Sequence, residues 1–207
     1  MVKRAIFYDD CRDASRLAAE YTLSGTAPNV YLDGNRFCYR WDATGFQTNR
    51  IVLMGFEPSK EFELTFLFKK NAIAVPAYGD MDIWWAYRAG PGTYYQNYNT
   101  DVNYFIRQPE NLGKWFTYVM NNAVWYVYKL RVSNANVLAK HWLLGTSEPD
   151  WMFNCKQGPF AGGNESSLNL LGKMSGKIAF AQMARQAGEY LEIADIRITP
   201  IPRTGGP

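Results

Sequence analysis

The stretch from Val124 to Phe153 limits the fold of this chain more than any other. Between Val124 and Val132 an apolar or aromatic residue stands at every second position, and this period of two places them on one face of a β-strand. Ser133–Asn136 then supplies turn residues, because Asn tolerates left-handed backbone angles and bonds to its own backbone. Val137–Leu144 follows as a partner strand. The stretch therefore predicts a β-hairpin followed by a loop that carries a tryptophan.

Other segments show the same alternation over short lengths. Glu61–Lys70 and Asp80–Arg88 alternate most clearly, and Asp33–Asn35 is a favourable hairpin turn between two further strands. Asp13–Tyr21 holds the one helical turn that we expect. Near the C-terminus the sequence predicts two more strands, paired as a last hairpin, after a long loop rich in Gly, Ser and Asn; these segments are Lys177–Ala184, Glu189–Ile198 and Asn154–Ser175.

Aromatic residues make up 16% of the chain, and they favour strands because they pack well on a half-buried pleated surface. Many short strands separated by Gly, Pro and Asn turns are typical of an antiparallel sandwich. We therefore expect an all-β fold, an antiparallel β-sandwich. Residues 1–207 are expected to form a single domain, of which residues 200–207 are an extended tail.

The charge and the cysteines exclude several classes of protein. A net charge of +3 with no dense Lys/Arg run lacks the electrostatic footprint of a nucleic-acid-binding protein. Three widely spaced cysteines, Cys11, Cys38 and Cys155, form neither a disulfide framework nor a zinc motif, and they favour a reducing compartment. The apolar run Ala5–Tyr8 is too short for a signal peptide or a membrane span. We expect synthesis in the cytoplasm without a signal peptide and no contact with membrane.

Four pieces of the chain, taken in order, resemble one known family. The third is the most specific: it combines a W-Y-V-Y-K-L strand, an A-K-H-W return strand and a G-T-S-E-P-D-W loop. Together the pieces are similar to the opening strand, early hairpin, central hairpin and closing strands of the concanavalin A-like lectin/glucanase family, in its laminin-G-like branch. The resemblance implies a jelly-roll sandwich, with the tryptophan loop packed back on the sheet as a structural element. The pieces are Phe7–Asp10, Asn29–Asn35, Trp125–Trp151, and Gly176–Phe180 with Ile193–Ile198.

Some relatives in this family hold a structural calcium between the opening strand and an acidic position in the last strand. Here Ala194 occupies the usual aspartate position, and Asp195 follows it. The sequence therefore predicts no cofactor. A structural calcium is the alternative, for which Asp195 with Asp9 or Asp10 would supply oxygen ligands.

Two carboxylates and one histidine are the candidates for catalysis. Asp80 and Asp82 lie two residues apart on one strand and hence on one face, where glycosidases of the resembling fold carry a run of acids. The next acid of that pattern is replaced by Trp84. His141 is the only histidine, and it lies mid-strand between Lys140 and Trp142, which favours a packed residue over a catalytic one. We expect no catalytic residues, with Asp80 and Asp82 as the alternative.

An aromatic and amide-rich segment is the best candidate for ligand binding. Its tyrosines and tryptophan offer apolar ring faces to sugars, and its amides suit sugar hydroxyls. The same composition suits a protein interface, or an edge strand that covers the rim of the sandwich, so all three interpretations stay open. The candidate residues are Trp84, Arg88, Tyr94, Tyr95, Asn97, Tyr98, Asn99 and Tyr104, with Asp101 and Asn103 in the same segment.

From these observations we expect a non-catalytic structural or binding module, namely a bacteriophage virion surface component such as a capsid decoration, fibre or tail protein. Its expected partners are other copies of itself, other proteins of an assembly, and glycans. Two alternatives remain at this point. One is a glycoside hydrolase or polysaccharide lyase that uses Asp80 and Asp82, and the other is a free lectin-like carbohydrate-binding protein.

Overall fold

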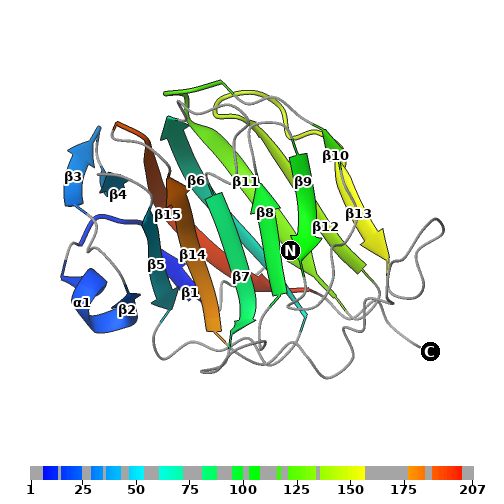
Figure 1. The fold of residues 1–207 in the computed structure, drawn as a ribbon, viewed down its shortest axis with the longest axis horizontal. Coiled ribbons are helices and arrows are strands. Elements are labelled where there is room, and N and C mark those ends of the chain that lie inside the picture. The colour runs from blue at the N-terminus through cyan, green and yellow to red at the C-terminus, as the bar shows by residue number, and fades with distance from the viewer. Residues whose placement is uncertain are drawn as a thin grey trace.

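The chain forms two antiparallel β-sheets packed face to face (Figure 1). The computed structural model describes residues 7–13, 15–24, 29–34, 36–42, 47–53, 61–71, 81–87, 95–99, 103–107, 116–117, 121–133, 136–156, 177–184 and 188–201. Every strand pairing in this part of the chain is antiparallel. The antiparallel β-sandwich expected from the alternating segments is therefore confirmed.

Sheet A contains eight of the described strands. Its order is β13-β12-β11-β6-β15-β4-β3, and β1 pairs with β15 beside this path. The strands are β1 (Phe7–Asp9), β3 (Asn29–Asp33), β4 (Arg36–Asp42), β6 (Phe62–Asn71), β11 (Tyr126–Val132), β12 (Asn136–Leu143), β13 (Phe153–Lys156) and β15 (Tyr190–Pro200).

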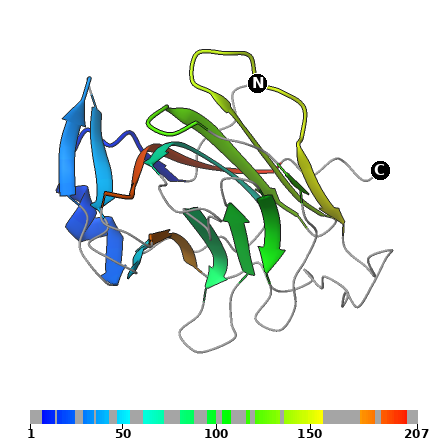
Figure 2. The same cartoon turned by 45° about the horizontal axis from the view of Figure 1, so that its top comes forward.

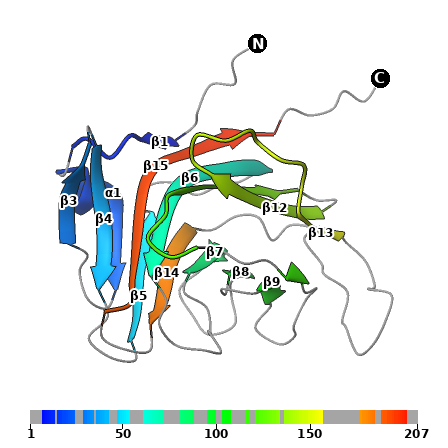
Figure 3. The same cartoon turned by 90° about the horizontal axis from the view of Figure 1, so that it is seen from above.

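Sheet B contains seven described strands and forms the second layer, which Figures 2 and 3 show beneath sheet A. Its order is β10-β9-β8-β7-β14-β5-β2. The expected helical turn is confirmed as α1 (Arg16–Glu20), which leads directly into β2. The strands are β2 (Tyr21–Ser24), β5 (Gln47–Leu53), β7 (Met81–Tyr87), β8 (Tyr95–Asn99), β9 (Asn103–Arg107), β10 (Phe116–Thr117) and β14 (Lys177–Ala184).

Alternation along the strands builds the core between the sheets. In β6, Phe62, Leu64, Phe66 and Phe68 are fully buried on the side that faces sheet B. The ring of Phe66 packs edge-on against Phe180 of β14, with 5.0 Å between ring centroids, so this pair joins the two layers. The opposite side of β6 carries the polar positions that form the outer face of sheet A.

The central hairpin is confirmed. β11 and β12 pair in register from Tyr126 opposite Leu143 to Val132 opposite Val137. The turn between them is held by Ser133, whose backbone N–H donates a 3.0 Å hydrogen bond to the carbonyl of Asn136. The Ser133 hydroxyl also accepts a 3.0 Å hydrogen bond from the Asn136 N–H. Turn chemistry that is legible in the sequence thus fixes the register of the hairpin.

The predicted closing hairpin is wrong, although both of its strands exist. β14 lies in sheet B between β5 and β7, whereas β15 lies in sheet A between β4 and β6. The chain therefore crosses from one sheet to the other between residues 184 and 190. The expected loop Asn154–Ser175 also differs at its start, because β13 pairs there with β12; residues 157–175 lie outside the described part of the chain.

Candidate functional site

The outward face of sheet B can be located from one buried residue. Phe180 of β14 is 1% exposed and faces sheet A. Successive residues of a strand occupy opposite faces, so Ala179 and Ala181 hold positions on the outward face. Their partners on β7 are Trp84 and Asp82, which therefore hold outward positions as well.

The next strand adds an aromatic position to this face. In the β7–β8 ladder Asp82 stands opposite Tyr98, and Trp84 stands opposite Gln96. Residues directly opposite in such a ladder have Cβ atoms about 5 Å apart. The register thus brings Asp82, Trp84 and Tyr98 to adjacent outward positions beside the two alanine positions of β14.

The other ligand-binding candidates do not share this face. Ile83 is the partner of Phe180 and of Asn97, so Asn97 belongs to the side that faces sheet A. Tyr95 and Asn99 lie two residues from Asn97 on β8 and share that side, and so does Tyr104, the partner of Asn99 on β9. The remaining candidates, Asp80, Arg88, Tyr94 and Asp101, lie outside the described residues.

Asp9, one of the residues considered as a calcium ligand, is enclosed by hydrogen-bond donors. Its side chain is fully buried. Oδ1 accepts from the Cys11 backbone N–H at 2.8 Å and from Arg16 at 3.3 Å, and Oδ2 accepts from the hydroxyls of Tyr21 at 2.7 Å and Tyr39 at 3.1 Å. Four donors occupy this carboxylate, so it is a structural group that ties β1 to α1, β2 and β4.

The two remaining acidic candidates also have partners. Asp195 has a positive φ of 50° at a bulge in β15, and its Oδ2 lies 3.1 Å from Nη1 of Arg36. Asp10 accepts a 3.2 Å hydrogen bond from the Arg12 N–H. Calcium requires six to eight oxygen ligands. Asp9, Asp10 and Asp195 do not fit such a site, and no group of three or more His, Cys, Asp or Glu among the described residues could hold a metal ion.

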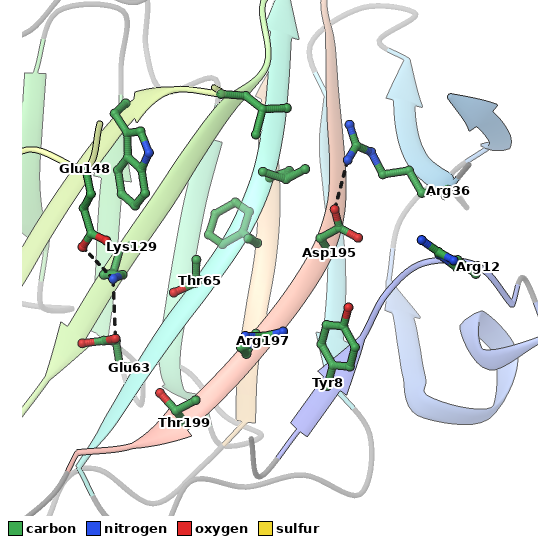
Figure 4. Close-up of a pocket in the computed structure, with 14 residues that line it drawn as sticks. Tyr8, Arg12, Arg36, Glu63, Thr65, Lys129, Glu148, Asp195, Arg197 and Thr199 are labelled. Atoms are coloured by element: carbon green, nitrogen blue, oxygen red, sulfur yellow. Dashed lines mark hydrogen bonds and ion pairs between the residues drawn. The ribbon is translucent and has the colours of Figure 1, made fainter. Parts of the chain in front are cut away.

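A groove of about 610 Å³ lies on the outer face of sheet A (Figure 4). Thr65 and Leu67 of β6 lie along its middle. One side carries Lys129 of β11 with Trp142 of β12, and the other side is formed by β15 and β1. Its further lining residues are Tyr8, Arg12, Arg36, Glu63, Phe66, Leu144, Glu148, Asp195, Arg197 and Thr199.

Ion pairs hold the side of the groove next to β11. Glu148, in the loop after β12, lies 2.6 Å from Nζ of Lys129 and 2.7 Å from Nζ of Lys140. Burial acts to raise the pKa of the Glu148 carboxyl, but the hydrogen bonds and charges of these two lysines together outweigh it, so the pKa is lowered. Glu63 accepts a 2.7 Å hydrogen bond from Arg131. The carboxylates on this side are therefore already neutralised by cations of the same sheet.

The tryptophan loop packs back on the sheet, as the family resemblance implied. The Lys140 ammonium lies 4.4 Å from the ring centroid of Trp151 and donates a 2.7 Å hydrogen bond to the carbonyl of Pro149. The Arg131 guanidinium lies 4.9 Å from the same ring. Cations stacked on an aromatic face stabilise the loop without exposing it as a platform for a ligand.

Sequence reasoning missed the groove. Its residues come from strands that are distant in the sequence, so no local motif contains them. One signal was present: the outward positions of the central hairpin carry Lys129, Arg131, Lys140 and Trp142 in place of the small polar residues of an ordinary solvated face. A charged and aromatic outer face on a central strand pair indicates a surface with a role beyond solubility.

His141 lies in the core and not at either face. It is fully buried, and its ring meets Tyr126 edge-on with 5.5 Å between centroids. Burial, with a smaller contribution from the charge of Lys70, lowers the pKa of His141 to about 3. The imidazole is therefore neutral at physiological pH and shielded from any substrate, in agreement with the packed residue expected from the sequence.

The fold defines a class of protein, the antiparallel β-sandwich jelly rolls, and it is similar to the folds of several solved sugar-related domains. The Emp46p carbohydrate recognition domain has a TM-score of 0.64 at 9% identity over 97% of this chain and all of that chain. The conserved carbohydrate esterase of the Shiga toxin-encoding bacteriophage phi24B has a TM-score of 0.62 at 11% identity, with the same coverage. The VIP36 exoplasmic/lumenal domain, in its Ca²⁺/mannose-bound form, has a TM-score of 0.60 at 8% identity over 90% and 85% of the two chains.

No family model matches the sequence, and no curated protein matches it either. At identities near 10% these likenesses establish the fold alone. Among the described residues no helix could cross a membrane, since α1 has five residues.

Proposed function

We propose that this protein is a non-catalytic glycan-binding module that holds a saccharide on the outward face of sheet B. The observation that carries the proposal is the register of β14, β7 and β8, which brings Asp82, Trp84 and Tyr98 to adjacent positions. Beside them, Ala179 and Ala181 occupy the outward positions of β14. Large aromatic positions next to small ones leave room for a flat ligand on the face of the sheet.

The chemistry of these residue types suits a sugar. The apolar face of a pyranose ring packs on indole and phenol rings, and the polar tips of those rings form hydrogen bonds at the same time. A carboxylate accepts hydrogen bonds from ring hydroxyls. Specific small-molecule sites combine apolar and aromatic surface with a few polar groups in this way. The likeness in fold to the carbohydrate recognition domain of Emp46p and to mannose-bound VIP36 supports the same ligand class.

The position of His141 supports the absence of catalysis. It is the only histidine of the chain, so a nucleophile activated by histidine would need it at an exposed site. Its burial and its low pKa remove it from that role. A carboxylate pair of Asp80 and Asp82 is the remaining route to catalysis, and it is favoured by the run of acids that glycosidases of the resembling fold carry on one strand. The likeness in fold to a phage carbohydrate esterase keeps a carbohydrate-active enzyme as the alternative.

The proposed location is the surface of a virus particle, as a decoration, fibre or tail protein. Support comes from the fold shared with a bacteriophage protein over 97% of this chain. A glycan-binding module on a virion would place its saccharide site toward the host surface. Other copies of the chain, or other virion proteins, would then contact the remaining surface.

A glycan array tests the binding function directly. We expect the wild type to bind a subset of neutral glycans, and Trp84→Ala and Tyr98→Ala to bind at least about tenfold more weakly, a change of ~1.4 kcal/mol. Leu32→Ala is the control, since Leu32 is 61% exposed on edge strand β3 of the other sheet. Unchanged binding in both aromatic variants would show that the outward face of sheet B does not bind the saccharide.

Activity on a panel of polysaccharides and acetylated saccharides tests the alternative. We expect no turnover above the buffer blank, and no difference between the wild type and Asp82→Asn. Turnover that is lost in Asp82→Asn would establish a carbohydrate-active enzyme and overturn the non-catalytic assignment.

The location is tested on purified particles. Virions from cells that carry the gene are purified on a density gradient, and their proteins are identified by mass spectrometry. We expect the chain to co-sediment with infectious particles in a fixed ratio to the capsid protein. Recovery from the soluble fraction alone would contradict a virion role and leave a free lectin-like protein.

A further inference from the structure

We propose that the groove on the outer face of sheet A is a second binding site, specific for an acidic saccharide whose carboxylate pairs with Arg197. The class of ligand rests on the proposed glycan-binding function. The site itself is independent of sheet B, because its residues come from β1, β4, β6, β11, β12 and β15 of sheet A and from the segments that follow β1 and β12.

Charge is unbalanced in the lining of the groove. Arg12, Arg36, Lys129 and Arg197 contribute four positive charges, and Glu63, Glu148 and Asp195 contribute three negative ones, which leaves a net charge of +1. Each of the three carboxylates lies within 3.1 Å of a cation: Arg131 for Glu63, Lys129 for Glu148, and Arg36 for Asp195.

These pairs leave over two cations of the lining, Arg12 and Arg197. Arg12 lies 3.8 Å from the carboxylate of Asp10. Arg197 is exposed, and its guanidinium lies 4.8 Å from the ring centroid of Tyr8. Within the described part of the chain it has no carboxylate partner, and Figure 4 shows its side chain in the groove between Thr199 and Asp195. The N–H donors of an arginine lie in one plane and match the two oxygens of a carboxylate. An arginine stacked on an aromatic ring can therefore bind a carboxylate with two parallel hydrogen bonds.

Two hydroxyl groups extend the polar end of the groove around Arg197. Thr65 of β6 stands directly opposite Arg197 in the β6–β15 ladder, and Thr199 stands two residues further along β15. Neither hydroxyl has a partner among the described residues. They are placed to bond to ring hydroxyls next to the bound carboxylate.

The far end of the groove combines apolar and aromatic surface with the ion pair between Lys129 and Glu148. Trp142 and Leu144 line it on the β12 side. In the ladders Thr65 stands opposite both Arg197 and Lys129, and Lys129 stands opposite Lys140, so the groove crosses the strands from β15 toward β12. Three strand spacings make about 14 Å, which is room for more than one sugar ring. A carboxylate at Arg197 and a ring face on Trp142 therefore fit one acidic oligosaccharide.

Isothermal titration with a matched pair of ligands tests this site. One ligand is a short oligogalacturonate, and the other is the same oligosaccharide with its carboxylates methyl-esterified, which removes the charge and keeps the rings. We expect the wild type to bind the acid at least about tenfold more tightly, ~1.4 kcal/mol, and this preference to shrink as ionic strength rises.

Three variants connect that preference to the groove. Arg197→Gln is expected to abolish it, and Arg197→Lys to keep part of it, because a lysine retains the charge without the fork. Lys156→Gln is the charge-matched control, since it removes one positive charge from β13 at the edge of the same sheet. We expect this control to keep the wild-type preference.

Two results would overturn the inference. The first is equal affinity of the wild type for acid and ester, and the second is an acid preference that survives in Arg197→Gln or disappears equally in Lys156→Gln. Both are separable from a failure of the proposed function. If neutral glycans bind through Trp84 and Tyr98 but the preference for the acid is absent, the groove proposal alone fails. If the preference for the acid is present and Trp84→Ala leaves it unchanged, the groove proposal holds even where the site on sheet B fails.

Discussion

Tyr21 Oη donates a 2.7 Å hydrogen bond to Oδ2 of Asp9, and this buried bond joins the two sheets of the sandwich. Asp9 belongs to β1 in sheet A, and Tyr21 belongs to β2 in sheet B. Burial raises the pKa of the Tyr21 phenol, and the Asp9 charge raises it further, so the phenol remains a donor over the whole physiological range. The bond fixes the N-terminal corner of the fold.

Tyr21→Phe therefore lowers stability by removing one donor from a buried carboxylate. We expect a loss of about 1.5 kcal/mol in the free energy of unfolding. For a chain of this size that lowers Tm by about 3–6 °C in a thermal melt. Tyr8→Phe is the matched control, because Tyr8 lies next to Asp9 on β1 and is 45% exposed. An equal shift in both variants would show that the cross-sheet bond contributes nothing specific.

Two carboxylates with similar partners, Glu192 and Glu148, differ in burial. Glu192 of β15 is 1% exposed and lies 2.9 Å from Arg40 and 2.7 Å from Lys69, its neighbours on the two flanking strands. Glu148 has equally short distances to two lysines, but its side chain is 44% exposed. Solvent screens the second group and not the first.

We therefore expect Glu192→Gln to cost about 3 kcal/mol of the free energy of unfolding, because it removes the buried carboxylate from the short ion pairs of two partly buried cations, Arg40 and Lys69. Glu148→Gln is expected to cost less than about 1 kcal/mol. Urea denaturation measures both, provided that the slope of the transition stays the same. Similar costs for the two variants would mean that burial does not decide the strength of these ion pairs.

The sequence predicts the local parts of this fold well, because the signals are local. Alternation of Val124–Val132 and the turn residues after it specify β11, β12 and their register. The same alternation in Lys177–Ala184 and Glu189–Ile198 specifies two strands but not their partners. All three partners of β15, which are β1, β4 and β6, come from much earlier in the chain, and a long-range pairing of this kind leaves no mark in a short window of sequence.

The candidate sites also contain a part that follows from local sequence signals and a part that depends on long-range strand pairing. Asp82 and Trp84 follow from the alternation of one strand, and the partner position of Tyr98 comes from one ladder. The groove requires that Lys129 and Arg197 both stand opposite Thr65, a relationship set by β6 lying between two distant strands. The role of Asp9 could not be predicted from the sequence either, because the sequence does not show whether a carboxylate near the N-terminus binds a metal ion or accepts hydrogen bonds from four internal donors.

The buried histidine gives the fold a specific dependence on pH. The pKa of His141 falls from its ordinary value of 6.5 to about 3 in the folded protein. Below pH 6.5 the histidine of the unfolded chain binds a proton that His141 of the folded chain does not bind. The stabilisation is therefore complete above pH 6.5 and is lost progressively as pH falls from 6.5 toward 3.

We expect the wild type to lose about 2–3 kcal/mol of stability between pH 7 and pH 4.5 that His141→Leu does not lose. Chemical denaturation of both proteins across this range measures the difference, and the comparison cancels the titration of the carboxylates that they share. Parallel pH profiles would show that His141 accepts its proton without unfolding.

Cys11 and Cys38 are predicted to be inert in the native protein. Cys11 and Cys38 are fully buried thiols. Burial raises the pKa of both groups, to about 11 for Cys38, and the Asp9 carboxylate raises that of Cys11 further. The thiolate is the reactive form, so at pH 8 neither residue has an appreciable nucleophilic fraction. Iodoacetamide labelling followed by peptide mass spectrometry should leave both unmodified under native conditions and modify both in guanidinium chloride. Rapid native labelling of Cys11 would place it in a solvent-exposed site and contradict the packing of the N-terminal corner around Asp9.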